Sequence, residues 1–221
     1  MTYLVNNMTI ARASLRSLCD LNVSILSQKL GLMESLVSKH GHTKALELYK
    51  SPCPIVGATI GQHVRHSMDH MELAALVATT NPFVSEQIPQ LHYDLRVRGG
   101  TLEHDMEEAR KRILHLSDML KQLLHPYPES TLHLQNPRLP LPTEKSTANS
   151  LHLVQANFML SSDGVEFGLL STMERELGFC AHHAIHHMAM IRIIAVHHAQ
   201  LDNLPPDFGR APSTVHHDHQ S

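Results

Sequence analysis

The sequence predicts an all-α protein whose single domain is a four-helix bundle with one long crossover. Four stretches repeat their apolar residues at the three- and four-residue spacing of an amphipathic helix. Aliphatic residues and methionine must form the core, because Trp is absent and aromatic residues make up only 4% of the 221 residues. The hydrophobic fraction of 42% suffices for one packed core, which excludes an intrinsically disordered chain.

The first two predicted helices are bounded by residues that favour helix ends. Residues 1–12 are expected to form a loose lead-in. Leucines at helical spacing predict a first helix over residues 13–38, and Gly41 should end it, because glycine readily takes the left-handed conformation found at helix C-termini. Thr59 can cap the N-terminus of a second helix, which should continue to about residue 79.

The third helix and the segment after it predict the crossover. Thr101 is a suitable cap for a helix over residues 102–124, which has the clearest apolar stripe in the chain. Residues 125–150 contain five prolines and should form a long connection. Residues 131–135 and 151–155 alternate weakly between apolar and polar side chains, and they could pair as a small hairpin.

The fourth helix completes a bundle domain expected over residues 13–200. It should begin at the capping-box pattern Ser171-x-x-Glu174 and continue to about residue 198. Residues 201–214 are expected to form an ordered segment that closes one end of the bundle, and residues 215–221 a disordered tail. Bundles of this kind build metal sites from inward side chains on facing helices.

Charge and composition argue against several functions. The formal net charge is −3 and no basic stripe is present, so nucleic-acid binding is not expected. No apolar run reaches the ~20 residues that a membrane-spanning helix requires, and no membrane partner is expected. Three cysteines without a C-x-x-C pair favour a reducing compartment, and we expect a cytoplasmic protein. The alternative is a mitochondrial transit peptide, which Arg12 and Arg16 in an acid-free N-terminus favour weakly.

Histidine is the over-represented residue, with 20 in the chain. His63, His66 and His70 lie on one stripe of the second helix, because residues three, four and seven apart share a helix face. Burying imidazoles without a partner is costly, so a histidine cluster in an apolar helix needs a reason. A metal ion shared with a facing helix would supply one.

The fourth helix carries two overlapping histidine pairs at four-residue spacing, His182 with His186 and His183 with His187. Either pair could bind one ion, and a third imidazole from the second helix would complete a three-histidine site. Periodicity does not choose between the pairs, because this helix is apolar on nearly all sides. Chance pairs are also expected in so histidine-rich a chain, and any single histidine is more simply a packing or surface residue.

Other residues near these motifs allow two interpretations each. Cys180, one helical turn before His183, is either a small buried hydrophobe or a thiol close to the metal. Asp69 or Glu174 could orient a ligand ring from outside the coordination sphere. The acidic cluster at the start of the third helix, which includes Glu103, is best explained as a solvated helix face.

The loop before the third helix contains Asp94, Arg96 and Arg98. The two arginines could bind an anionic substrate through paired hydrogen bonds. The same residues could instead form a structural ion network with Glu103 or Glu107. The sequence leaves these two explanations open.

Five motifs together resemble one known superfamily. They are the stretches Ile60–His66, Tyr93–Arg98, Arg175–Phe179, His183–His187 and Asp207–Thr214. The chain resembles the DinB/YfiT-like superfamily of small metal-dependent four-helix proteins over roughly residues 15–214, and is closest to a subgroup of uncharacterised function. Members place one histidine in the second helix and an H-x-x-x-H pair in the fourth.

The resemblance implies His66, His183 and His187 as the metal ligands. It chooses the second histidine pair of the fourth helix where periodicity could not. One departure is that the superfamily commonly has Gly and Gln after the last ligand, where this chain has Ala189 and Met190. A role for that Gln next to the ligands is therefore not carried over.

The implied function is binding of a divalent metal ion, Zn, Ni or Fe, at a site with an open coordination position. Three protein ligands leave room for a bound water or thiol, which the ion would activate. The resemblance implies a thiol transferase or hydrolase acting on a small molecule, with a low-molecular-weight thiol as the cosubstrate. The alternatives are a non-catalytic metal-binding or sensing module and a purely structural helical module. Related bundles often pair, so a homodimer is compatible with the sequence.

Overall fold

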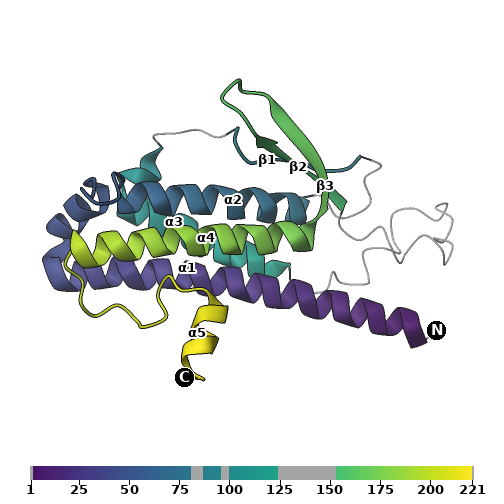
Figure 1. Cartoon of the computed structure of the whole chain (residues 1–221), viewed down its shortest axis with the longest axis horizontal. Coiled ribbons are helices and arrows are strands. Elements are labelled where there is room, and N and C mark those ends of the chain that lie inside the picture. The colour runs from purple at the N-terminus through teal and green to yellow at the C-terminus, as the bar shows by residue number, and fades with distance from the viewer. Residues whose placement is uncertain (1, 81–86, 96–99, 124–152, 221) are drawn as a thin grey trace.

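Long helices form most of the molecule, and a small sheet lies across one end of them (Figure 1). The computed structural model describes residues 2–80, 87–95, 100–123 and 153–220. The helices are α1 Thr2–Lys50, α2 Ile60–Thr80, the short 3-10 helix η1 Thr101–Glu103, α3 Met106–Gln122, α4 Met173–His197 and α5 Pro212–Asp218. The strands are β1 Gln90–His92, β2 Leu153–Met159 and β3 Glu166–Thr172.

The sheet corrects the prediction of an all-α fold. Its strand order is β1-β2-β3, with β1 parallel to β2 and β2 antiparallel to β3. A hairpin does precede the fourth helix, but it is not the predicted pair, because β2 pairs with the residues that follow it in β3. The predicted partner, residues 131–135, lies outside the described residues. Leu91, Val154 and Ala156 are fully buried, so the sheet covers the helices with apolar side chains, which is the physical reason that it forms.

Helix α1 is longer than predicted in both directions. It begins at Thr2, where a loose lead-in was predicted, and no Gly or Pro interrupts the sequence before Gly31. Gly41 does break the helix, with φ 74° and ψ 163°, but a further helical segment continues to Lys50. The segment after Gly41 is therefore helical and not the end of the helix, because Ala45, Leu48 and Tyr49 bury one face of it.

The other helix caps follow the predicted chemistry with small shifts. Thr59 and Gln62 form a reciprocal capping box, in which each side chain accepts a bond from the other residue's backbone N–H. Helix α3 is capped by Asp105 and not by Thr101, because Thr101 begins the separate 3-10 turn. Helix α4 is capped by Thr172 and not by Ser171, whose hydroxyl donates to Glu176 instead.

The C-terminal segment packs along the flank of the bundle instead of closing an end. Phe208 is buried, and the Gly209 N–H donates to Gln28 Oε1 at 3.0 Å. A side chain at Gly209 would lie 2.6 Å from the Met188 carbonyl oxygen, so only glycine allows this approach. The predicted disordered tail is largely helical, since α5 extends to Asp218, which pairs with Arg210.

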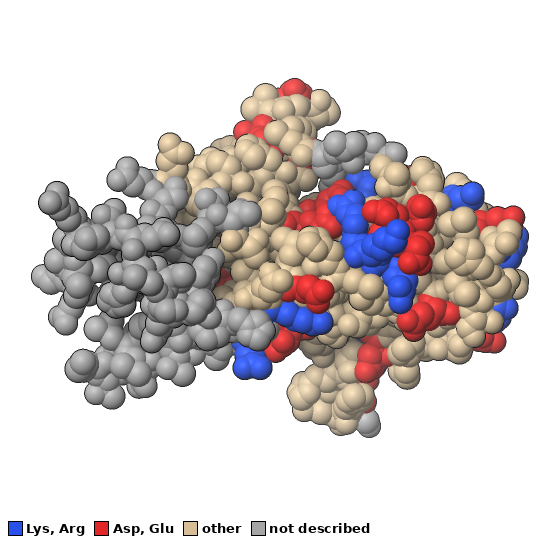
Figure 2. Space-filling model, turned by 180° about the vertical axis from the view of Figure 1, so that it is seen from behind, with Lys and Arg blue, Asp and Glu red and all other residues tan. Residues whose placement is uncertain are grey.

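Four long helices pack around a shared core, and their directions place the histidines. Helices α1 and α4 run one way and α2 and α3 the other (Figure 1). Helix α2 packs between α3 and α4, and α1 packs against α3 and α4. Acidic and basic side chains are interleaved on the opposite face of the molecule (Figure 2). None of the described helices is long and apolar enough to cross a membrane.

The acidic start of α3 is only partly the solvated face that was predicted. Glu107 is exposed, but Glu103 is buried, with its Oε1 2.6 Å from Arg65 Nε. Arg65 also donates to Asp69 at 2.7 Å, so it bridges two carboxylates between α2 and η1. This ion network holds the N-terminal half of α2, on which the histidines lie.

Lys29 is an unusual member of the core, because its side chain is completely buried. Its Nζ donates to Ser67 Oγ at 2.7 Å, and that hydroxyl donates to the His63 carbonyl oxygen at 2.8 Å. Burial lowers the pKa of Lys29 from 10.5 to about 7, although Glu72 and Asp69 oppose the shift. The unfolded chain therefore binds this proton more tightly than the folded chain.

Replacing Lys29 with Met should stabilise the protein at pH 7 by on the order of 1–3 kcal/mol, because the buried amine no longer has to lose its hydration. The folded pKa is lowered, so the stability of wild type should rise between pH 7 and 10, and the Met variant should lack this increase. Urea unfolding across that pH range measures both effects. If the stability of the two proteins depended on pH in the same way, the lowered pKa of Lys29 in the folded protein would be contradicted.

Gly61 permits the close approach of α2 to η1. A Cβ at this position would lie 2.3 Å from the Glu103 carbonyl oxygen, so Gly61→Ala should destabilise the fold by about 1–3 kcal/mol. Gly31→Ala is the matched control: no heavy atom lies within 4 Å of its Cβ, and it should stabilise α1 by about 0.5–1 kcal/mol. Thermal unfolding compares the stability of the two variants. A Gly61→Ala variant as stable as wild type would show that the contact with the Glu103 backbone is not tight.

Candidate metal centre

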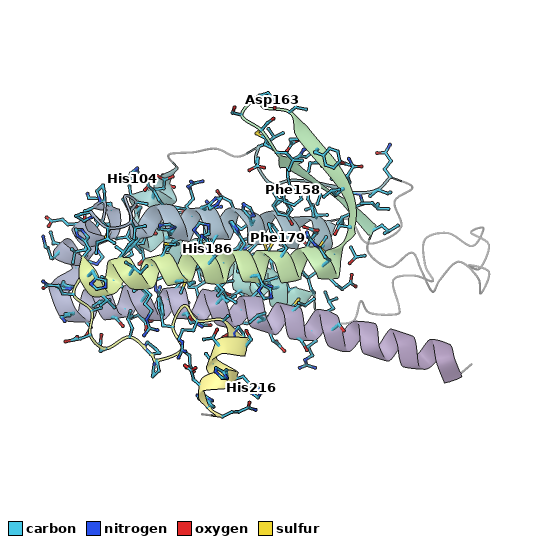
Figure 3. All side chains as sticks on the ribbon, viewed as in Figure 1. His104, Phe158, Asp163, Phe179, His186 and His216 are labelled. Atoms are coloured by element: carbon cyan, nitrogen blue, oxygen red, sulfur yellow. The ribbon has the colours of Figure 1, made fainter. Side chains whose placement is uncertain are left out.

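Helices α2 and α4 bring two histidine stripes face to face. We define the histidine cluster as His63, His66, His70, His183 and His187. Figure 3 shows the surroundings, with Phe179 and His186 on α4 and Phe158 on the hairpin beside it. His70 and His187 are buried, and the other three members are half-buried. His182 and His186 are exposed, which fits their interpretation as surface residues.

Three rings of the cluster lie close together. The Nε2 atom of His183 lies 3.2 Å from the Nε2 atoms of both His66 and His187. The ring centroids of these three residues are 4.6 to 4.9 Å apart, and each pair of ring planes crosses at 72° to 89°. The structure therefore brings the three predicted ligands close together, with His183 in nitrogen contact with each of the other two.

His70 belongs to the same cluster, although the sequence favoured a packing or outer role for it. Nitrogens of His66, His70 and His183 all lie within 4.8 Å of one another, a spacing that could hold a metal ion. The ring of His70 stacks on that of His183, with centroids 4.3 Å apart and planes 17° apart. The geometry thus supplies four candidate ligands where the sequence predicted three.

The spacing of these nitrogens fits coordination. Two nitrogens that each lie ~2.0–2.1 Å from one tetrahedral ion are about 3.3–3.4 Å apart. The observed separations of 3.2 Å are close to this value. A neutral imidazole nitrogen offers either one N–H or one in-plane lone pair. His183 Nε2 therefore cannot form good hydrogen bonds to two other nitrogens, whereas a cation could accept all three lone pairs.

Burial and neighbouring imidazoles lower the pKa of two rings in the cluster, His63 and His187. Burial, followed by the neighbouring His66, His183, His63 and His186, lowers the pKa of His187 to about 2. Burial and the nearby His186 also lower the pKa of His63. Neutral imidazole is the form that binds metal ions, so the cluster does not have to release protons from these two rings at neutral pH.

A buried polar network lies beside the cluster, and sequence reasoning missed it. Tyr93 stacks on His70 with centroids 4.9 Å apart, and its hydroxyl donates to Glu176 Oε2 at 2.9 Å. Glu176 is fully buried and also accepts bonds from Ser171 and Arg175. Tyr93 and Glu176 both lie in resemblance motifs, Tyr93–Arg98 and Arg175–Phe179, but neither motif indicated that the two side chains contact each other.

Cys180 is a neutral buried thiol. Its Sγ donates to the His70 carbonyl oxygen at 3.3 Å and lies 3.8 Å from Tyr93 Oη. Burial raises its pKa to about 12. A metal-bound or nucleophilic cysteine needs the thiolate form, so this environment favours the packing interpretation.

The remaining predicted site residues lie elsewhere. Asp94 accepts a bond from the Met159 backbone N–H at 2.8 Å, which ties the loop after β1 to the end of β2. Arg96 and Arg98 lie outside the described residues. Asp69 pairs with Arg65, and burial raises its pKa. Glu174 is nine residues before His183, about 14 Å along the helix axis, which is too far to orient that ring.

Comparisons with known proteins give one partial match. The chain is 30% identical over 127 residues to FK506-binding protein 5 of Rhizopus delemar, which covers 58% of this chain and 27% of that protein. The chain thus spans about a quarter of the length of that relative. No family model matches the sequence, and no solved structure matches it.

All three cysteines should resist labelling in the native protein, because Cys19, Cys53 and Cys180 are each at most 1% exposed. An aromatic disulfide reagent such as DTNB should find no reactive thiol in native protein at pH 8 and three in denaturant. Ser38→Cys, at an exposed position of α1, provides a reactive control. Rapid labelling of native Cys180 would instead indicate an activated thiol.

Proposed function

We propose that this chain is a DinB-like protein that binds one divalent metal ion through His66, His183 and His187. The observation that carries the proposal is that His183 Nε2 lies 3.2 Å from the Nε2 atoms of both other residues. Zn, Ni and Fe(II) all suit neutral imidazole ligands. With three protein ligands, the ion keeps an open position for a water or a thiol.

Ring orientation favours His187 over His70 as the third ligand. Lone pairs lie in the ring plane, so rings that cross steeply can direct them at one point, and the planes of His66, His183 and His187 cross at 72° to 89°. The rings of His70 and His183 are nearly parallel, so their lone pairs run side by side. His70 would have to rotate before it could share an ion with His183.

The proposed activity is that of a metal-dependent enzyme, a thiol transferase or hydrolase acting on a small molecule. A bound ion supplies positive charge that lowers the pKa of a water or thiol in the open position. The residues of the chain hold this centre in a largely buried environment between two helices. The resemblance implies a bundle of up-down-down-up or related topology. The directions of the four long helices support the DinB-like assignment, with the sheet as an addition. A cytoplasmic location and a homodimer remain predictions.

A non-catalytic metal-binding module is the second candidate, because one observation favours it. His70 offers a nitrogen within 4.8 Å of those of His66 and His183. If its ring rotated on binding, four imidazoles would surround the ion and close the coordination sphere. A closed sphere is typical of structural metal sites and leaves no position for a substrate.

Metal analysis of protein purified without a histidine tag should find about one ion per chain. His66→Ala, His183→Ala and His187→Ala should each weaken binding more than about 100-fold, beyond the loss expected for residues outside the coordination sphere. His182→Ala, at an exposed position of the same helix, should bind like wild type. Competition with a chelator measures affinity, and circular dichroism of the metal-free proteins confirms folding.

The same proteins separate the two candidates. In the enzyme, His70→Ala should retain the ion, and thiol-transfer or hydrolysis activity should disappear in His187→Ala. In a closed site, His70→Ala should release the ion, and the cobalt-substituted wild type should show no exchangeable ligand. A wild type that binds no metal, or triad variants that bind as tightly as wild type, would refute the proposal.

A further inference from the structure

The geometry points to His63 as a positioning residue that fixes the ring of His187 in its metal-binding orientation and tautomer. This inference rests on the proposed metal site. His63 lies on α2, one turn before His66, and its Nδ1 atom is 2.8 Å from the Nδ1 atom of His187. The two ring centroids are 5.1 Å apart with planes 44° apart, so the rings meet edge to edge instead of stacking.

The direction of this hydrogen bond follows from the other side of the His187 ring. Its Nε2 atom faces His183 Nε2, where the proposed ion would accept its lone pair. A neutral imidazole that offers a lone pair at Nε2 carries its proton at Nδ1. His187 must therefore donate, and His63 Nδ1 must accept. The His63 proton is then on Nε2, a buried atom that has no hydrogen-bond partner among the described residues.

The backbone around His63 is held firmly enough for this role. The His63 carbonyl oxygen accepts a bond from Ser67 Oγ, which in turn accepts one from the buried Lys29. The acceptor for His187 is therefore attached to a turn of α2 that is tied to α1. Metal-binding histidines usually donate their second N–H to a carboxylate, a carbonyl or water, and this partner fixes the ring and its tautomer. Here a neutral imidazole takes that place.

Two substitutions at His63 separate hydrogen bonding from simple packing. His63→Asn keeps an acceptor, because the Asn Oδ1 atom occupies nearly the position of the His Nδ1 atom. His63→Leu fills similar space without an acceptor. We expect the Leu variant to lose 10- to 100-fold in zinc affinity and the Asn variant to stay within about threefold of wild type. His182→Leu, at an exposed position of α4, is the control for the loss of a histidine outside the cluster and should bind zinc like wild type.

Zinc affinity is measured by chelator competition, and the unfolding temperature of each metal-free protein is measured separately. Nitrogen-15 NMR of zinc-loaded wild type should show His187 protonated at Nδ1, a readout that does not depend on any variant folding. Equal affinities of His63→Leu and wild type, equal losses in the Leu and Asn variants, or a His187 proton on Nε2 would overturn the inference. If wild type binds no zinc, the metal site itself fails, and this inference fails with it.

Discussion

The contact between α2 and α4 is the constraint on which the rest of the structure depends. Each helix turns a row of imidazoles toward the other, and imidazoles withdrawn from water require a compensating partner. Nitrogen contacts of 2.8 and 3.2 Å within the cluster meet this requirement only in part, because His183 Nε2 cannot bond well to two nitrogens at once. Aliphatic side chains would make a stable interface here without the cost of burying imidazoles. The polar cluster therefore suggests that these residues serve a function besides packing.

The sheet contributes to the cluster through a continuous series of aromatic contacts. Phe158 on β2 stacks on Tyr93, Tyr93 on His70, and His70 on His183. Phe179 lies beside this series, with its ring centroid 5.4 to 6.0 Å from the centroids of all four of these rings. Because packed rings restrict rotation, this series holds His70 parallel to His183 and keeps it from turning toward the other nitrogens. The strands therefore help to set the orientation of the His70 ring within the histidine cluster.

Local sequence signals predicted the helices well and their exact ends less well. Thr59 caps α2 as predicted, because a threonine followed three residues later by glutamine is a complete local signal. At the start of α4, two neighbouring residues carry hydroxyl groups that could cap the helix. Ser171 donates to the buried Glu176 instead, and Thr172 forms the cap. The sheet could not be predicted from β1, because three residues carry too little periodicity and their partners in β2 lie 65 positions later in the sequence.

The sequence alone determined that two helices carry histidines at helical spacing, and the resemblance selected His66, His183 and His187, which remain a prediction. These conclusions depend on local periodicity, which a single sequence records directly. Only the tertiary structure decided which nitrogens meet, that His70 stacks and that His63 contacts His187. The reason is physical: periodicity fixes the face of a helix, but the distance and angle between rings on two helices depend on how the whole bundle packs.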